Sequence, residues 1–406
     1  MKFAIVMTGG VCKGAFQAGA LRAFAEFNLK PSVVVGTSAG AINAGLLTNL
    51  IVQDNFVSSK IEENLTRPWI SEMNFSNLWG KAEEGKKDSI RNIFSDVNTN
   101  PFLLIKRLAN LQTDVWNKVR QLLAMSFLSV FNRSVLTQYL DRTLKTPKEI
   151  KSDIICAISV TDLFGHSEII NGKLFNNYSD FIIFDFKKDD QNIEKKFDFF
   201  RESIAASSGF PGMFQPSELD VKGNGEKRLY VDGGITKNAP FGRAVKLDPE
   251  LEYIFVISTS PVTKPLSNEI NDFASVSGQV YEIVITKDIV NDYRKVTQIN
   301  QKVKLLHKII EKDENGVVID NERNHDLCKL AGFKSVKDFL SKRCVEVIFI
   351  EPSHPLEGDP FAGFYKKERR YLMESYIKHG YDMGKKVLVE FMKNIDKSEL
   401  KEEINK

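Results

Sequence analysis

A serine in a glycine-rich turn is the first residue whose setting suggests catalysis. Gly36-Thr37-Ser38-Ala39-Gly40 fits the pattern G-x-S-x-G, in which a strand turns abruptly into a helix and exposes a serine hydroxyl. The β-branched run 33–35 before it favours a strand, and the Ala-rich stretch 41–50 after it favours a helix. This context predicts Ser38 as a nucleophile, although the motif alone fits a glycine-rich turn with an idle serine equally well.

A nucleophilic serine needs a base, and the five histidines of the chain are poorly placed for that role. In a Ser-Asp-His order the histidine comes last, which leaves His354 and His379 as candidates. Neither lies in a segment with the features of a strand end or a glycine-rich core loop. We therefore interpret both as ordinary surface or loop residues.

Asp232 is the better candidate base. It follows the short strand-like run Leu229–Val231 and precedes Gly233 and Gly234, which permit a tight turn, and active sites of parallel α/β sheets assemble at strand ends. A free aspartate has a pKa of about 3.9 and is a weak base near neutrality. Asp232 can accept the proton if Ser38 is directly hydrogen-bonded to it and partial desolvation raises its basicity. The alternative is a plain Asp-Gly turn.

The loop Gly9–Gly14 is the candidate oxyanion hole, because backbone N–H groups at a helix N-terminus can cradle a developing negative charge. The expected donors are Gly9, Gly10, Val11 and Cys12. Two nucleotide-binding patterns fail on spacing: a dinucleotide fingerprint needs glycine where Val11 stands, and a P-loop needs a lysine after its last glycine. Cys12 as a nucleophile ranks well below Ser38, since no histidine is near it in sequence.

The elements around these residues predict an α/β fold. The run 3–7 before the Gly loop has the composition of a buried strand, and further strands are expected at 154–160, 228–231, 253–259 and 345–350, with helical stretches between them. Residues 51–133 interrupt this alternation and include the apolar run Leu122–Phe131, which we interpret as a packed helix or, alternatively, as an interface-seeking segment. Asn171-Gly172 predicts a hairpin turn.

Composition excludes several classes of protein. The 406 residues are 42% hydrophobic and 27% charged, and 56 basic against 53 acidic residues give a net charge of +3, which offers no argument for nucleic-acid binding. Four scattered cysteines predict neither disulfides nor a zinc site. The absence of a signal-peptide core and of a long apolar run predicts a cytoplasmic protein without transmembrane helices, with signal-independent export left open.

Several segments together resemble the patatin-like phospholipase family. The resemblance rests on these ordered segments: Gly9–Leu21, Gly36–Gly40, Asn132–Leu140, Ala205–Pro216, and Asp232-Gly233-Gly234 with Asn238 and Pro240 after it. The match covers roughly residues 3–245. The chain departs from the family pattern at Val11, where the family usually has a third glycine, and there we expect altered geometry or specificity.

The resemblance implies a three-layer fold and a Ser-Asp dyad that cleaves acyl lipids, with Ser38 as nucleophile, Asp232 as base, and no metal or nucleotide cofactor. It implies supporting roles for these motif residues: Lys13, Gly14, Gly36, Gly40, Gly233 and Gly234. Lys13 stands where the family carries Arg or Lys, and we expect it to anchor the loop.

We expect a catalytic domain at 1–245, with a helical insertion at about 51–133. The α/β extension at 246–406 is either separate or part of the same domain. The expected activity is that of a phospholipase A or lysophospholipase. Acyl transfer with the same dyad and a catalytically impaired lipid-binding or effector protein are the alternatives.

The expected partner is a phospholipid or other acyl-ester lipid. We expect peripheral contact with a membrane, through the insertion or through the basic cluster Lys366–Arg370. The sequence leaves the oligomeric state open.

Overall fold

The structure is a computed structural model that describes residues 1–73, 133–170, 172–188, 190–211, 214–263, 273–358 and 368–404. Most of the expected insertion, with the apolar run Leu122–Phe131, lies outside these residues, as does Asn171 of the predicted hairpin turn.

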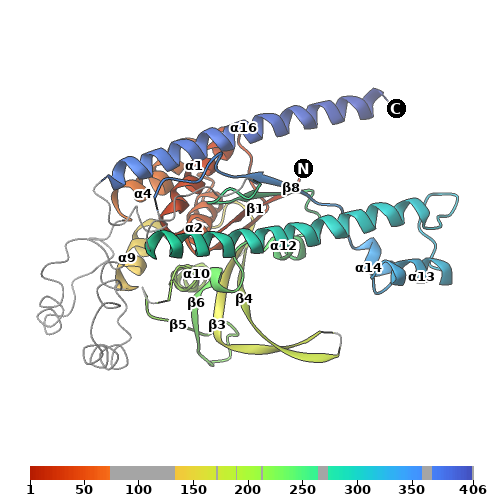
Figure 1. Cartoon of the computed structure of the whole chain (residues 1–406), viewed down its shortest axis with the longest axis horizontal. Coiled ribbons are helices and arrows are strands. Elements are labelled where there is room, and N and C mark those ends of the chain that lie inside the picture. The colour runs from red at the N-terminus through yellow and green to blue at the C-terminus, as the bar shows by residue number, and fades with distance from the viewer. Residues whose placement is uncertain are drawn as a thin grey trace, which may run out of the picture.

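One mixed sheet forms the centre of the molecule (Figure 1). Within the described residues its strands run in the order β5-β6-β3-β2-β1-β7-β8, and β4 pairs with β3 outside this path. The neighbours from β3 to β8 in this order are parallel, while β4, β5 and β6 join antiparallel. The strands are β1 (Phe3–Met7), β2 (Val33–Thr37), β3 (Ile154–Ile170), β4 (Lys173–Phe186), β5 (Ser217–Leu219), β6 (Arg228–Asp232), β7 (Tyr253–Ile257) and β8 (Glu346–Ile350).

Helices cover both faces of the sheet. They are α1 (Gly14–Glu26), α2 (Ala39–Val52), α3 (Ser58–Ile61), α4 (Arg67–Ser71), α9 (Arg133–Thr143), α10 (Ile193–Ser207), α11 (Phe241–Leu247), α12 (Phe273–Ile309), α13 (Glu322–Leu330), α14 (Val336–Leu340) and α16 (Arg369–Ile404). A π-helical turn, Glu62–Thr66, joins α3 to α4.

Alternation along β1 shows how the layers arise, because successive side chains of a strand point to opposite faces. Phe3, Ile5 and Met7 join the core cluster that includes side chains of α1, α2, α10 and α16. Ala4 and Val6 join a second cluster with side chains of α11 and α12. The prediction of a three-layer α/β fold with a central, mostly parallel sheet is therefore confirmed.

Strands β7 and β8 follow residue 245 and extend the same sheet on the far side of β1. Helix α16 lies along α1, where Gly19 and Gly380 allow close contact: a β-carbon on either glycine would collide with the backbone of the opposite helix (Figure 1). The far end of α12 packs with α13 and α14 around a small separate cluster.

The hairpin of β3 and β4 extends well beyond its neighbours (Figure 1). Thr37, the last residue of β2, is in register with Ser159, whereas β3 continues in the same direction to Ile170. The outer part of the hairpin therefore projects past the carboxyl edge of the parallel strands. Gly172, in the predicted turn, has a φ of 76°.

Candidate active site

Ser38 occupies the sharp turn between β2 and α2. Its φ of 56° and ψ of −125° lie outside the regions that non-glycine residues ordinarily adopt, as expected of a nucleophile held in a strained strand-to-helix turn. The flanking glycines have a steric reason: a β-carbon on Gly36 would clash with the Gly40 carbonyl, and one on Gly40 would clash with the Met7 carbonyl. The motif thus packs the turn directly against β1.

The Ser38 hydroxyl donates a hydrogen bond of 2.6 Å to Asp232 Oδ2, across 194 residues of sequence. Both side chains are buried, with 4% of Ser38 and 1% of Asp232 exposed. The other carboxylate oxygen accepts the Gly234 N–H at 2.8 Å. Burial raises the pKa of Asp232 from 3.8 to about 6, while the bonds from Ser38 and Gly234 act in the opposite direction. The pair has the geometry and basicity for direct proton transfer.

Sheet register brings the two residues together. Strand β3 is parallel to β2, with Ser159 opposite Thr37, and antiparallel to β6, with Val160 opposite Asp232. Asp232 at the end of β6 and Ser38 after β2 are therefore separated by one intervening strand, β3. A β-carbon on the next residue, Gly233, would collide with the Ser159 carbonyl. This glycine therefore lets the loop Asp232–Ala239, which we call the Asp turn, approach β3.

The two histidines considered as bases lie together, away from Ser38. His354 Nδ1 and His379 Nε2 are each 3.0 Å from the hydroxyl of Ser353. The pKa of His379 is lowered by burial and by the neighbouring His354. Within the described part of the chain, neither histidine is bonded to Ser38 or Asp232.

The Gly loop contains one residue whose role differs from the expectation. Gly9 donates its N–H to the Asn238 side-chain oxygen at 2.6 Å, so this donor is already committed and cannot face an oxyanion. Among the described residues, none accepts a bond from the N–H of Gly10 or Val11. Cys12 is buried in the 3-10 turn Val11–Lys13.

Val11 adopts a φ of 52°, in the left-handed region where a β-branched residue is a genuine outlier. Glycine adopts this region without strain. Valine at position 11, where the family pattern has a third glycine, is therefore a source of backbone strain. No described residue accepts a hydrogen bond from the Val11 N–H in this turn.

Lys13 is buried beneath the loop and forms an ion pair of 2.6 Å with Glu282 of α12. Gly14 follows it at the start of α1, where a β-carbon would press against the Trp69 ring. Trp69 in turn donates its indole N–H to Asn43 of α2, and Asn43 donates to the Gly14 carbonyl. Buried polar contacts with α12 and α2 thus hold the Gly loop in place.

Two serines that were not predicted from the sequence as site residues hold the backbone of the nucleophile. The Ser207 hydroxyl accepts the Ser38 N–H at 3.0 Å and donates to the Ser159 carbonyl at 2.6 Å. The Ser208 hydroxyl donates to the Ser38 carbonyl at 3.0 Å. Both lie in the segment Ala205–Pro216, so the available signal was the small-residue block itself.

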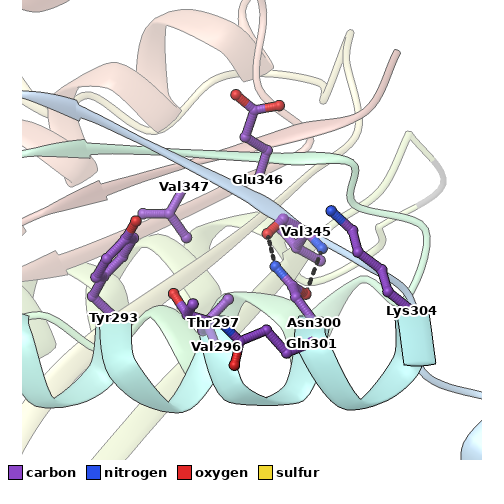
Figure 2. Close-up of a pocket in the computed structure, with 9 residues that line it drawn as sticks. All are labelled: Tyr293, Val296, Thr297, Asn300, Gln301, Lys304, Val345, Glu346 and Val347. Atoms are coloured by element: carbon purple, nitrogen blue, oxygen red, sulfur yellow. Dashed lines mark hydrogen bonds between the residues drawn. The ribbon is translucent and has the colours of Figure 1, made fainter. Parts of the chain in front are cut away.

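A hollow of about 380 Å³ lies apart from the dyad, between α12 and the edge strand β8 (Figure 2). In it the Asn300 side chain bonds to both the N–H and the carbonyl of Val345, as a neighbouring strand would. A smaller hollow of about 170 Å³ lies beside the Asp turn and is lined by Gly234, Thr236, Asn238 and residues of α12. In the described ranges, no cluster of three or more His, Cys, Asp or Glu side chains could hold a metal ion.

The basic cluster expected at Lys366–Arg370 is not a uniformly solvated surface. Arg369 is turned inward, where its guanidinium donates to the carbonyls of Trp69, Ile70 and Met73. Arg370 is exposed and pairs with Glu374, while residues 366 and 367 lie outside the described ranges.

No helix among the described residues is both long and apolar enough to span a bilayer.

The family model for patatin-like phospholipase matches residues 5–245, and no curated protein matches the sequence. VipD from Legionella pneumophila is similar with 14% identity and a TM-score of 0.35, over 96% of this chain and 67% of that one. A human GIVD cytosolic phospholipase A2 is similar with 10% identity and a TM-score of 0.38, over 97% of this chain. The similar part is 62% of that human protein, less than two thirds of its length.

Proposed function

Because this chain belongs to the patatin-like phospholipase family, we propose that it hydrolyses acyl esters of phospholipids or lysophospholipids through an acyl-enzyme at Ser38. The observation that carries the proposal is the 2.6 Å hydrogen bond between Ser38 and a buried Asp232. This bond provides a nucleophile with a base already in contact, and burial raises the pKa of that base to about 6. At pH 7 roughly nine in ten such carboxyls are ionised.

The chemistry follows from this geometry. Asp232 accepts the hydroxyl proton as Ser38 Oγ attacks the ester carbonyl, and the resulting oxyanion is stabilised by the free N–H groups of Gly10 and Val11. Collapse of the tetrahedral species breaks the ester bond, and the leaving alcohol takes the proton from Asp232. Water then attacks the acyl-enzyme with Asp232 again as base, which releases the fatty acid and restores Ser38. No step requires a metal or a cofactor.

The decisive experiment is labelling with a fluorophosphonate probe, together with measurement of fatty acid released from phospholipid and lysophospholipid. We expect wild-type protein to react in both assays and Ser38→Ala to react in neither. Asp232→Asn should lose most of the rate while keeping the fold. Absence of both probe labelling and fatty-acid release from the wild type would contradict the proposal. Lipid binding in that case would favour the non-catalytic alternative, and a new ester formed with an added alcohol would indicate acyl transfer.

We further propose that lipid is approached through the outer part of the β3–β4 hairpin, which projects from the edge of the sheet that carries Ser38. Ile169 and Leu174 face each other across the two strands and are 73% and 67% exposed. Apolar side chains at such a position can enter the interfacial region of a bilayer.

Flotation with phosphatidylcholine vesicles tests this approach. The double variant Ile169→Asp/Leu174→Asp should bind vesicles more weakly than the wild type. Leu330→Asp is the matched control, since Leu330 is 86% exposed on α13 at the far end of α12. Equal flotation of wild type and double variant would remove the hairpin from this role.

A further inference from the structure

Helix α12 lies beyond the residues that the family model matches, yet it contacts both loops of the candidate active site. It covers the face of the sheet opposite α1 and α2 and passes beside the Gly loop and the Asp turn. Two of its acidic side chains, Glu282 and Asp288, make these contacts.

The first contact is the buried ion pair of Glu282 with Lys13. The two side chains are 5% and 4% exposed, and the second carboxylate oxygen of Glu282 accepts a hydrogen bond from the Ser260 hydroxyl. A buried charge that loses its partner is strongly destabilised, so the pair defines one position for the Lys13 side chain. Lys13 ends the 3-10 turn that begins at Val11, and its position therefore constrains the oxyanion donors.

The second contact is with the loop that follows Asp232, and Asn238 of that loop links it to the Gly loop. Asp288 Oδ2 accepts the N–H of Asn238 at 2.7 Å and that of Ala239 at 3.1 Å, and Asp288 Oδ1 accepts the Lys237 ammonium at 3.0 Å. Asn238 is 1% exposed and uses its side-chain oxygen to hold the Gly9 N–H. Asp288 thus fixes the backbone of the residue that fixes Gly9.

From these contacts we infer that Glu282 and Asp288 are positioning residues that set the oxyanion loop relative to the Asp turn. The inference rests on the proposed hydrolase function, and its physical basis is that proton transfer and oxyanion stabilisation occur on different loops. A misplacement of about 1 Å between groups that act together can cost on the order of a hundredfold in rate. Helix α12 contacts both loops, and its carboxylates Glu282 and Asp288 make the connecting bonds.

The test compares Glu282→Gln and Asp288→Asn with the matched control Glu311→Gln, which removes a carboxylate paired with Arg323 beyond the end of α12. We expect kcat for ester hydrolysis and the fluorophosphonate labelling rate to fall about tenfold to a hundredfold in the first two variants. The Michaelis constant and the midpoint of the pH–rate profile should stay unchanged, because substrate contacts and the surroundings of Asp232 are retained. The control should match the wild type.

Amide hydrogen exchange provides a readout that does not depend on activity. Peptides covering Gly9–Gly14 should exchange faster in both variants, while those from β1 and β2 should not change. If a single variant fails to fold, Lys13→Met/Glu282→Leu replaces the buried pair with apolar groups and should fold with the same faster loop exchange. The inference is overturned if loop exchange matches the wild type, or if the rate falls only in proportion to the unfolded fraction. A wild type that does not react with the probe contradicts the proposed function, whereas the exchange comparison still tests the contact between helix and loop.

Discussion

Asp232→Asn is expected to make the protein more stable above neutral pH while removing its activity. The carboxylate is buried beside Ser38, and burial raises its pKa from 3.8 to about 6. The folded state therefore binds a proton that the unfolded state has already released, and folding stability falls as the pH rises between these values. Asparagine keeps the shape of the side chain, can accept the Gly234 N–H, and carries no charge at any pH.

The magnitude follows from the two pKa values. Each pH unit between them corresponds to about 1.36 kcal/mol, so ionisation of Asp232 costs about 3 kcal/mol of folding stability once the pH is well above 6. At pH 4 the same cost is below about 1 kcal/mol, since the carboxyl is protonated in the folded state and still about two-fifths protonated in the unfolded one. The stability gained by Asp232→Asn should therefore grow by about 2 to 3 kcal/mol between pH 4 and pH 8.

Urea denaturation at 25 °C, repeated from pH 4 to pH 8, measures this difference. Subtracting the wild-type curve from the variant curve cancels the contribution of every other titrating group that the substitution leaves unchanged. Ser38→Ala is the control, because it should be inactive but keeps the buried carboxyl. Its stability should fall with pH at least as much as that of the wild type, since loss of the Ser38 hydrogen bond raises the pKa of Asp232 further. The reasoning is refuted if Asp232→Asn is no more stable than the wild type at pH 8, or if its advantage does not depend on pH.

Three further outcomes follow from the same site. In the wild type, kcat/KM should rise about tenfold per pH unit below pH 6 and level off above it, because Asp232 must be ionised to accept the proton; a rate independent of pH between 4 and 7 would contradict this. Val11→Gly should raise the free energy of unfolding by about 1 kcal/mol, as measured by urea denaturation, since it relieves a left-handed valine; a loss of stability would show that the valine side chain contributes more by packing. Ser207→Ala should lower stability by about 1 to 3 kcal/mol and slow labelling of Ser38, because the Ser38 N–H loses its buried acceptor; labelling at the wild-type rate would remove Ser207 from the positioning of the nucleophile.

Local steric rules made much of the site predictable from the sequence. A serine between glycines after a β-branched run predicts a strained turn, and Ser38 lies in such a turn with a φ of 56°. Strands expected at 3–7, 154–160 and 345–350 correspond to β1, the first part of β3, and β8. These predictions need only the neighbouring residues, because backbone sterics and side-chain alternation act over a few positions.

Other features depend on residues far apart in the chain, and the sequence by itself did not determine them. The bond between Ser38 and Asp232 spans 194 residues and exists because β3 pairs with β2 on one side and β6 on the other. The tertiary structure also decided that Gly9 gives its N–H to Asn238.

The contacts of α12 likewise depend on the tertiary structure and not on local sequence. No local pattern indicated that Lys13 would pair with Glu282, 269 residues away. The sequence by itself thus indicated the candidate catalytic residues and the strained backbone of the turn at Ser38, since both depend on residue type and immediate neighbours. Sheet register and helix packing decided which N–H groups stay free, which carboxyl is desolvated, and which helix holds the loops, because hydrogen-bond commitment and burial depend on the whole folded chain.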